Sequence, residues 1–167
     1  SPFNEHHLLD FARTSGLRVV QFGDHVPLHT FDAARIATLR HAAMRDGFTL
    51  EIGARGLTAE HVKHYLALAR ELHSPLLRFV IDGPEYEPAP DEVVAIVRDA
   101  IPLLATANVT LGIENHDRFP ARALRSMIER IGICLDTANS LGAGEGLGHV
   151  LDQLAPFTVN LHVKDFV

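Results

Sequence analysis

Three short apolar runs end in side chains that can bind a metal ion or move a proton, namely Glu114, Asp136 and His162. The runs span residues 109–113, 131–135 and 157–161. A polar side chain inside a core costs free energy unless it is paired or binds something. Two carboxylates and an imidazole suit Mn²⁺, Co²⁺, Zn²⁺ or Mg²⁺, and three protein ligands leave positions open for a substrate. We therefore predict a divalent-metal site at Glu114, Asp136 and His162, with Mn²⁺ foremost.

Further polar residues follow the three strand ends and are predicted to bind substrate. His116 and Asn139 lie just past the first two ligands and can hydrogen-bond a polyhydroxylated compound, orient the ligands, or cap a loop. Lys164 follows His162 and can hold an anionic or hydroxyl group. A salt bridge from Lys164 to Asp165 or Glu114 is the structural alternative.

Several other residues have a structural interpretation. Arg78 lies in an apolar run and must pair with a carboxylate, for which Glu51 on the neighbouring strand is a candidate. The single cysteine, Cys134, reads as a small core residue. Most of the eleven histidines are interpreted as surface residues, including His61 and His64, which lie one helical turn apart on a solvated face.

Composition bounds the class of protein. A chain of 167 residues with 47% hydrophobic and 22% charged residues can form one domain with a sizeable core. It shows no transmembrane run and no secretory signal, and its single cysteine fits a reducing, cytoplasmic location. A net charge of −6 argues against a nucleic-acid partner. The glycines at 142–148 lack the GxGxxG spacing of a dinucleotide-binding turn.

Helical and strand patterns alternate along the whole chain, which predicts α/β units around a parallel sheet. Three more strands are expected at residues 17–22, 48–52 and 76–81. Polar residues end nearly every strand, which favours a (β/α)₈ TIM barrel, because all strand ends of a barrel meet at one mouth. Six of the eight βα units are visible, so we expect residues 1–167 to be a single, incomplete TIM-barrel domain.

The ordered set of motifs resembles the xylose-isomerase-like TIM-barrel superfamily, the sugar phosphate isomerase/epimerase group. The stretches that carry the resemblance are VQFGD (20–24), LGIENH (111–116), GICLDTANS (132–140) and LHVKD (161–165). The resemblance implies that Glu114, Asp136 and His162 are metal ligands. It also implies a fourth ligand, a Glu on the eighth strand, which these residues do not include. That Glu and Glu114 would form the acid/base pair.

The resemblance implies an enzyme of carbohydrate metabolism, a metal-dependent isomerase or epimerase of a small sugar or sugar phosphate, in which a carbon-bound proton is moved through a metal-stabilised enediolate. A dehydratase-type lyase on the same scaffold and a non-catalytic sugar-binding barrel are the alternatives. Asn139 replaces a histidine seen in many relatives, which counts against the trinuclear zinc site of an apurinic endonuclease. Whether the protein forms a homodimer is left open.

Overall fold

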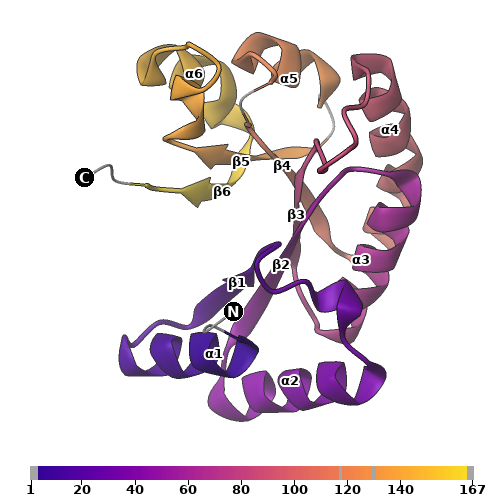
Figure 1. Cartoon of the computed structure of the whole chain (residues 1–167), viewed down its shortest axis with the longest axis vertical. Coiled ribbons are helices and arrows are strands. Elements are labelled where there is room, and N and C mark those ends of the chain that lie inside the picture. Colours follow the sequence, from indigo (N-terminus) through magenta and orange to yellow (C-terminus); the bar gives the residue numbers. More distant parts are fainter. Residues whose placement is uncertain (1–3, 117, 129–130, 165–167) are drawn as a thin grey trace.

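The computed structural model describes residues 4–116, 118–128 and 131–164. Six parallel strands lie in sequence order in one sheet, which curls into a half-barrel with helices on its outer side (Figure 1). The strands are β1 (Val19–Phe22), β2 (Thr49–Arg55), β3 (Leu76–Val80), β4 (Thr110–Glu114), β5 (Gly132–Asp136) and β6 (Thr158–His162). The helices are α1 (Glu5–Thr14), α2 (Ala33–Asp46), α3 (Ala59–Glu71), α4 (Pro90–Ala107), α5 (Ala121–Met127) and α6 (Leu147–Leu154), with 3₁₀ turns η1 (Leu28–Thr30), η2 (Asn139–Leu141) and η3 (Ala155–Phe157).

The two faces of the sheet differ because successive strand residues point to opposite sides. Outward-facing apolar residues pack against the helices and are completely buried, and they are Phe22, Ile52, Leu77, Phe79, Ile113 and Ile133. The concave face instead carries polar residues and glycines in matched register, such as Gln21 beside Glu51 and Gly53 beside Arg78. The core therefore lies between sheet and helices, and the inside of the half-barrel is polar.

Local capping explains where several helices begin and end. The Asp32 side chain accepts from the Arg35 amide at 2.7 Å and so begins α2, and Thr58 does the same for α3 through the His61 amide. Gly47 ends α2 with φ of 71°, a left-handed conformation that glycine adopts without strain.

The sequence allows either a kink or a break at Pro102, and the structure shows no break, because α4 runs as one helix from residue 90 to 107 with this proline inside it. The helix expected at residues 120–130 is described only as α5, and residues 129–130 lie outside the described residues.

The prediction of a TIM-barrel fold with six visible βα units is confirmed.

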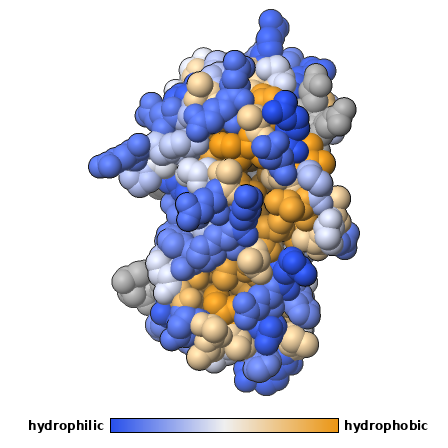
Figure 2. Space-filling view, turned by 90° about the vertical axis from the view of Figure 1, so that its right-hand side faces the viewer, coloured by the Kyte–Doolittle hydropathy of each residue, from blue (hydrophilic) through white to orange (hydrophobic). Residues whose placement is uncertain are grey.

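On the side of α3 and α4, the surface is largely hydrophilic with a band of apolar residues between the polar ones (Figure 2). Among the described residues, no helix has the length and apolar character needed to cross a membrane.

Candidate metal centre

The three predicted ligands are the last residues of β4, β5 and β6, and the curl of the sheet brings their side chains together. The Nδ1 atom of His162 lies 3.6 Å from Glu114 Oε2 and 3.7 Å from Asp136 Oδ2. Glu114 and Asp136 are buried, with 6% and 0% exposure, whereas His162 is partly open to solvent. The three groups thus meet at the carboxyl-terminal mouth of the half-barrel.

The two separations at His162 are close to those of ligands of one cation, because bonds of about 2.1 Å place two ligand atoms roughly 3.0–3.4 Å apart. Asp136 is not in the set whose ligand atoms all lie within 4.8 Å of one another, so the Asp136 carboxylate would have to move toward Glu114 to share a cation with it. The two buried carboxylates and the imidazole beside them are the oxygen and nitrogen donors that Mn²⁺, Co²⁺ and Zn²⁺ accept. The residues therefore fit a divalent metal, which they would hold through Glu114, Asp136 and His162.

Glu114 is held at both carboxylate oxygens. Arg78 Nη1 lies 3.2 Å from Oε2, and both side chains are about 7% exposed. Asn139 Nδ2 donates to Oε1 at 3.0 Å and also to the Asn115 carbonyl. The carboxylate is thereby fixed before any ligand arrives.

The guanidinium of Arg78 fits against the backbone because glycines line its path. A Cβ at Gly53 would lie 2.8 Å from Arg78 Nε, and a Cβ at Gly23 would lie 3.0 Å from Nη2. The pairing expected between Arg78 and Glu51 is wrong. Arg78 instead contacts Glu114, which lies on the neighbouring strand β4, two residues beyond the register partner Gly112. Glu51 instead accepts from Gln21 and Asn160 at 2.9 and 3.2 Å.

Asp136 is fixed by its own turn and by a buried amide. Its Oδ1 accepts from the amides of Ala138 and Asn139 at 2.9 and 3.0 Å, and Asn115 pairs with its backbone at 2.6 and 3.0 Å. Burial raises the pKa of the Asp136 carboxyl, but the Lys164 ammonium, 2.6 Å from Oδ2, and the two amides outweigh burial, so the pKa is lowered. The group is a carboxylate at neutral pH.

His162 is neutral because burial lowers its pKa, an effect that Glu114 and Asp136 offset only in part. Its Nε2 lies 2.8 Å from Gln21 Oε1 on β1. An amide oxygen only accepts, so Nε2 carries the proton and Nδ1 faces the two carboxylates as a lone pair. This is the protonation state a metal ligand needs.

The sequence did not indicate that Cys134 belongs to this cluster. Its side chain is buried on the concave face, 3.1 Å from Asn160 Oδ1 and 3.5 Å from His162 Nε2. Glu114, Cys134 and His162 offer ligand atoms within 4.8 Å of one another. Burial raises the pKa of the thiol to about 12. Its placement two residues before Asp136 on β5 is the signal that could have identified it.

The three predicted substrate-binding residues also lie at this mouth. Asn139 orients Glu114, as described, and Lys164 pairs with Asp136 rather than with Glu114; Asp165 lies outside the described residues. His116 Nε2 lies 2.9 Å from Arg55 Nη2, and the Arg55 Nε in turn lies 3.8 Å from Asp24. Asn139 and Lys164 thus contact the predicted metal ligands directly, whereas His116 contacts Arg55.

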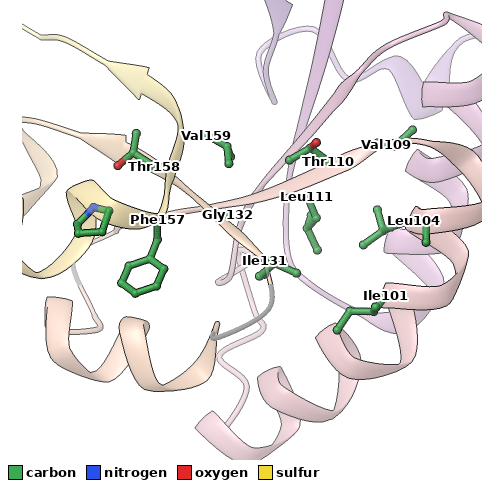
Figure 3. A pocket seen from close by; sticks show the side chains of 12 residues that line it. Ile101, Leu104, Val109, Thr110, Leu111, Ile131, Gly132, Phe157, Thr158 and Val159 are labelled. Carbon is green, nitrogen blue, oxygen red and sulfur yellow. The ribbon is translucent and has the colours of Figure 1, made fainter.

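An apolar pocket lies at the opposite end of the strands. A pocket of about 570 Å³ opens at the amino-terminal ends of β4, β5 and β6 (Figure 3). Its lining is mainly apolar and includes Ile101, Leu104, Leu111, Ile131 and Phe157. No ionisable side chain lines it among the described residues, so the mouth with Glu114 remains the candidate site.

Comparison with known proteins gives a family and several similar folds. The family model described as xylose isomerase-like TIM barrel matches residues 9–167. A 3-oxo-isoapionate decarboxylase of Pectobacterium atrosepticum is 32% identical over 164 residues, which cover 95% of this chain and 60% of that protein. The chain thus spans about three fifths of the length of that relative.

Two solved structures illustrate the fold. D-psicose 3-epimerase of Clostridium cellulolyticum H10, crystallised with D-tagatose, has a TM-score of 0.77 and 15% identity over 96% of this chain and 67% of its own. The IOLI protein, solved with a zinc atom, has a TM-score of 0.73 and 12% identity over 98% of this chain and 73% of its own. At these identities the likeness concerns the fold alone.

Proposed function

The chain belongs to the xylose isomerase-like TIM-barrel family, and on that premise we propose that Glu114, Asp136 and His162 bind a divalent metal in an enzyme that acts on a small oxidised sugar. The observation that carries the proposal is that the carboxylates of Glu114 and Asp136, at the ends of β4 and β5, lie 3.6 and 3.7 Å from His162 Nδ1 at the end of β6. A divalent cation held there would supply a Lewis acid for a carbonyl oxygen of the substrate.

The choice of metal depends on which side chains complete the set. With Asp136, the oxygen-rich set suits Mn²⁺; with Cys134, a sulfur donor favours Zn²⁺. We favour the oxygen-rich set because Asp136 is the last residue of β5, at the mouth, whereas Cys134 lies two residues earlier on the same strand and deeper in the half-barrel. Mn²⁺ is therefore the cation we expect to bind most productively.

The reaction we favour is loss of carbon dioxide from a 3-oxo sugar acid. The relative at 32% identity is a decarboxylase, and two cations flank the carboxylate cluster. Lys164, whose side chain is 49% exposed, can pair with a substrate carboxylate at the mouth. The bond between the carboxyl carbon and its neighbour breaks, its electron pair passes into the adjacent carbonyl as an enolate, carbon dioxide leaves, and the carbon takes up a proton from solvent.

Epimerisation or isomerisation is the second candidate, favoured by one observation. Glu114 is a carboxylate fixed at the mouth by Arg78 and Asn139, and a carboxylate beside a bound carbonyl compound can remove a carbon-bound proton. This reaction needs a second acid/base group on the opposite face of the substrate. Epimerisation breaks a carbon–hydrogen bond, whereas decarboxylation breaks a carbon–carbon bond, so the products distinguish the two reactions.

The test uses the intact protein with Mn²⁺ and Zn²⁺, and compares Glu114→Gln, Asp136→Asn and Cys134→Ser. We expect the first two variants to bind Mn²⁺ at least tenfold more weakly and Cys134→Ser to bind it normally. Incubation of 3-oxo sugar acids and of ketohexoses in D₂O then separates the reactions. Release of carbon dioxide indicates decarboxylation, and deuterium in a recovered ketose indicates epimerisation. Unchanged Mn²⁺ binding in both carboxylate variants would refute the site.

A further inference from the structure

A chain of polar side chains on the concave face joins β1 to β6, the two edge strands of the curled sheet (Figure 1). Gln21 on β1 and Glu51 on β2 are register partners, and the Gln21 amide nitrogen donates to Glu51 Oε2 at 2.9 Å. His162 Nε2, on β6, donates to Gln21 Oε1 at 2.8 Å. All three side chains are partly buried. One amide therefore connects the carboxylate of Glu51 to the imidazole of His162.

The direction of each hydrogen bond in this chain is set by Glu51. A carboxylate only accepts, so the amide nitrogen of Gln21 faces Glu51 and the amide oxygen faces His162. Asn160, two residues before His162 on β6, reinforces the arrangement, because its Oδ1 accepts from Gln21 Nε2 at 3.3 Å and its Nδ2 donates to Glu51 Oε2 at 3.2 Å. Rotating the Gln21 amide would place its oxygen against both of these oxygens.

The other nitrogen of the His162 ring faces two groups that favour the opposite position of the proton. Nδ1 lies 3.6 Å from Glu114 Oε2 and 3.7 Å from Asp136 Oδ2. Carboxylate oxygens only accept, so by themselves they would draw the ring proton to Nδ1. A proton on Nδ1 would occupy the lone pair through which a neutral imidazole binds a metal. An acceptor at Nε2 is therefore needed to keep Nδ1 available.

The thiol of Cys134 cannot take the place of Gln21 as this acceptor. Its Sγ lies 3.5 Å from His162 Nε2, but sulfur is a weak acceptor of hydrogen bonds. The thiol donates its own proton to Asn160 Oδ1 at 3.1 Å. Gln21 Oε1, at 2.8 Å, is thus the stronger partner of the imidazole N–H.

Glu51 strengthens the acceptor that Gln21 presents. A hydrogen bond to an ionised group is stronger than one between neutral groups, and linked hydrogen bonds polarise one another. Donation from the Gln21 amide nitrogen to Glu51 therefore makes the Gln21 oxygen a better acceptor for His162. Metal-binding histidines commonly donate their second ring N–H to a carboxylate or a carbonyl, and here a carboxylate acts through an amide.

We propose that Gln21, supported by Glu51, is a positioning residue of the metal centre, because it holds the proton of His162 on Nε2 and keeps Nδ1 open toward Glu114 and Asp136. This role rests on the metal site of the proposed function. Gln21 acts through His162 and is not itself a ligand. β1 and β2 thereby take part in a site whose predicted ligands all come from β4, β5 and β6.

The first test uses the intact protein without metal, at neutral pH. Long-range proton–nitrogen NMR spectra show which ring nitrogen of His162 carries the proton, with the His162 signals assigned from their loss in His162→Asn. We expect the proton on Nε2 in the wild type and on Nδ1 in Gln21→Leu. Gln153→Leu, the same substitution on the outer helix α6, should leave the proton on Nε2.

The second test exchanges the two supporting side chains. Gln21→Glu combined with Glu51→Gln keeps an acceptor at His162 Nε2 and keeps a hydrogen bond from an amide to a carboxylate, so the proton should stay on Nε2. The Mn²⁺ affinity, measured by calorimetry, should follow the position of the proton. We expect it to be at least tenfold weaker in Gln21→Leu and close to the wild-type value in the exchanged pair and in Gln153→Leu.

Two results would overturn this role of Gln21. One is that Gln21→Leu, shown to be folded by circular dichroism, keeps the proton on Nε2 or binds Mn²⁺ as tightly as Gln153→Leu. The other is a proton on Nδ1 in the exchanged pair, which decides the question alone if Gln21→Leu does not fold. Because the proton is located without metal, a wild-type protein that binds no Mn²⁺ would refute the proposed function, and the NMR result would still decide the role of Gln21.

Discussion

Replacing Arg78 with methionine tests whether the guanidinium holds the concave site together. Arg78 Nη1 and Glu114 Oε2 are 3.2 Å apart, and each side chain is about 7% exposed, so the pair is shielded from solvent. Removing one partner of a buried pair costs about 3–5 kcal/mol, because the other charge remains buried without compensation. Asn139 continues to donate to Glu114, which places the expected loss near the lower end, about 3 kcal/mol.

The assay is urea unfolding of the intact protein in EDTA, with Arg98→Met as the matched control. Arg98 lies on α4 with its side chain 72% exposed, and its nearest carboxylate, on Asp99, is 3.9 Å away, so we expect a loss of at most about 0.5 kcal/mol. Arg78→Lys keeps the charge but loses the planar fork, and should fall between the two. If Arg78→Met unfolds at the same urea concentration as Arg98→Met, the reasoning is wrong.

Three further perturbations follow from contacts elsewhere in the fold. In Gly53→Ala the new Cβ would lie 2.8 Å from Arg78 Nε, so we expect a lower temperature of thermal unfolding and weaker Mn²⁺ binding. The control Gly148→Ala, on α6 with open space around the new Cβ, should leave the temperature of thermal unfolding unchanged or raise it slightly. Arg35 donates to Glu5 at 2.7 and 2.8 Å and thereby lowers the pKa of Glu5 in the folded protein. The pair therefore stabilises the fold at pH values above the ordinary pKa of Glu, about 4.3, and this stabilisation is lost as the pH falls through the lowered pKa of Glu5. Glu5→Gln should therefore be less stable than wild type at pH 7 and converge with it toward pH 3, while the exposed Glu85→Gln shows no such trend. Arg118 joins Asp82 to the Pro88 carbonyl, so Arg118→Lys should speed hydrogen exchange at residues 83–90 roughly tenfold, and Arg122→Lys should not.

The sequence predicted the fold well because the strand pattern is strong and repeated. Each expected strand was found within one or two residues at its start, and Glu114, Asp136 and His162 are the last residues of their strands. Parallel strands bring their carboxyl ends to one edge, so adjacency of the three side chains followed from topology alone. That they bind a metal stays a prediction.

The partner of Arg78 could not be predicted in the same way. Glu51 on β2 was one candidate, but β4 is the other neighbour of β3, and Arg78 contacts Glu114 there while Gly53 and Gly23 leave room for its guanidinium.

The charges on the concave face define what metal binding must overcome. Glu114 already contacts the Arg78 guanidinium, and Asp136 contacts the Lys164 ammonium, so a divalent cation has to compete with both. The two cations differ in how easily they leave. Arg78 is enclosed by glycine backbone, whereas Lys164 has a half-exposed side chain that can turn toward solvent. A metal at Asp136 would therefore release Lys164 rather than Arg78, and the freed ammonium would stand at the mouth, where it could pair with the carboxylate of the substrate we propose.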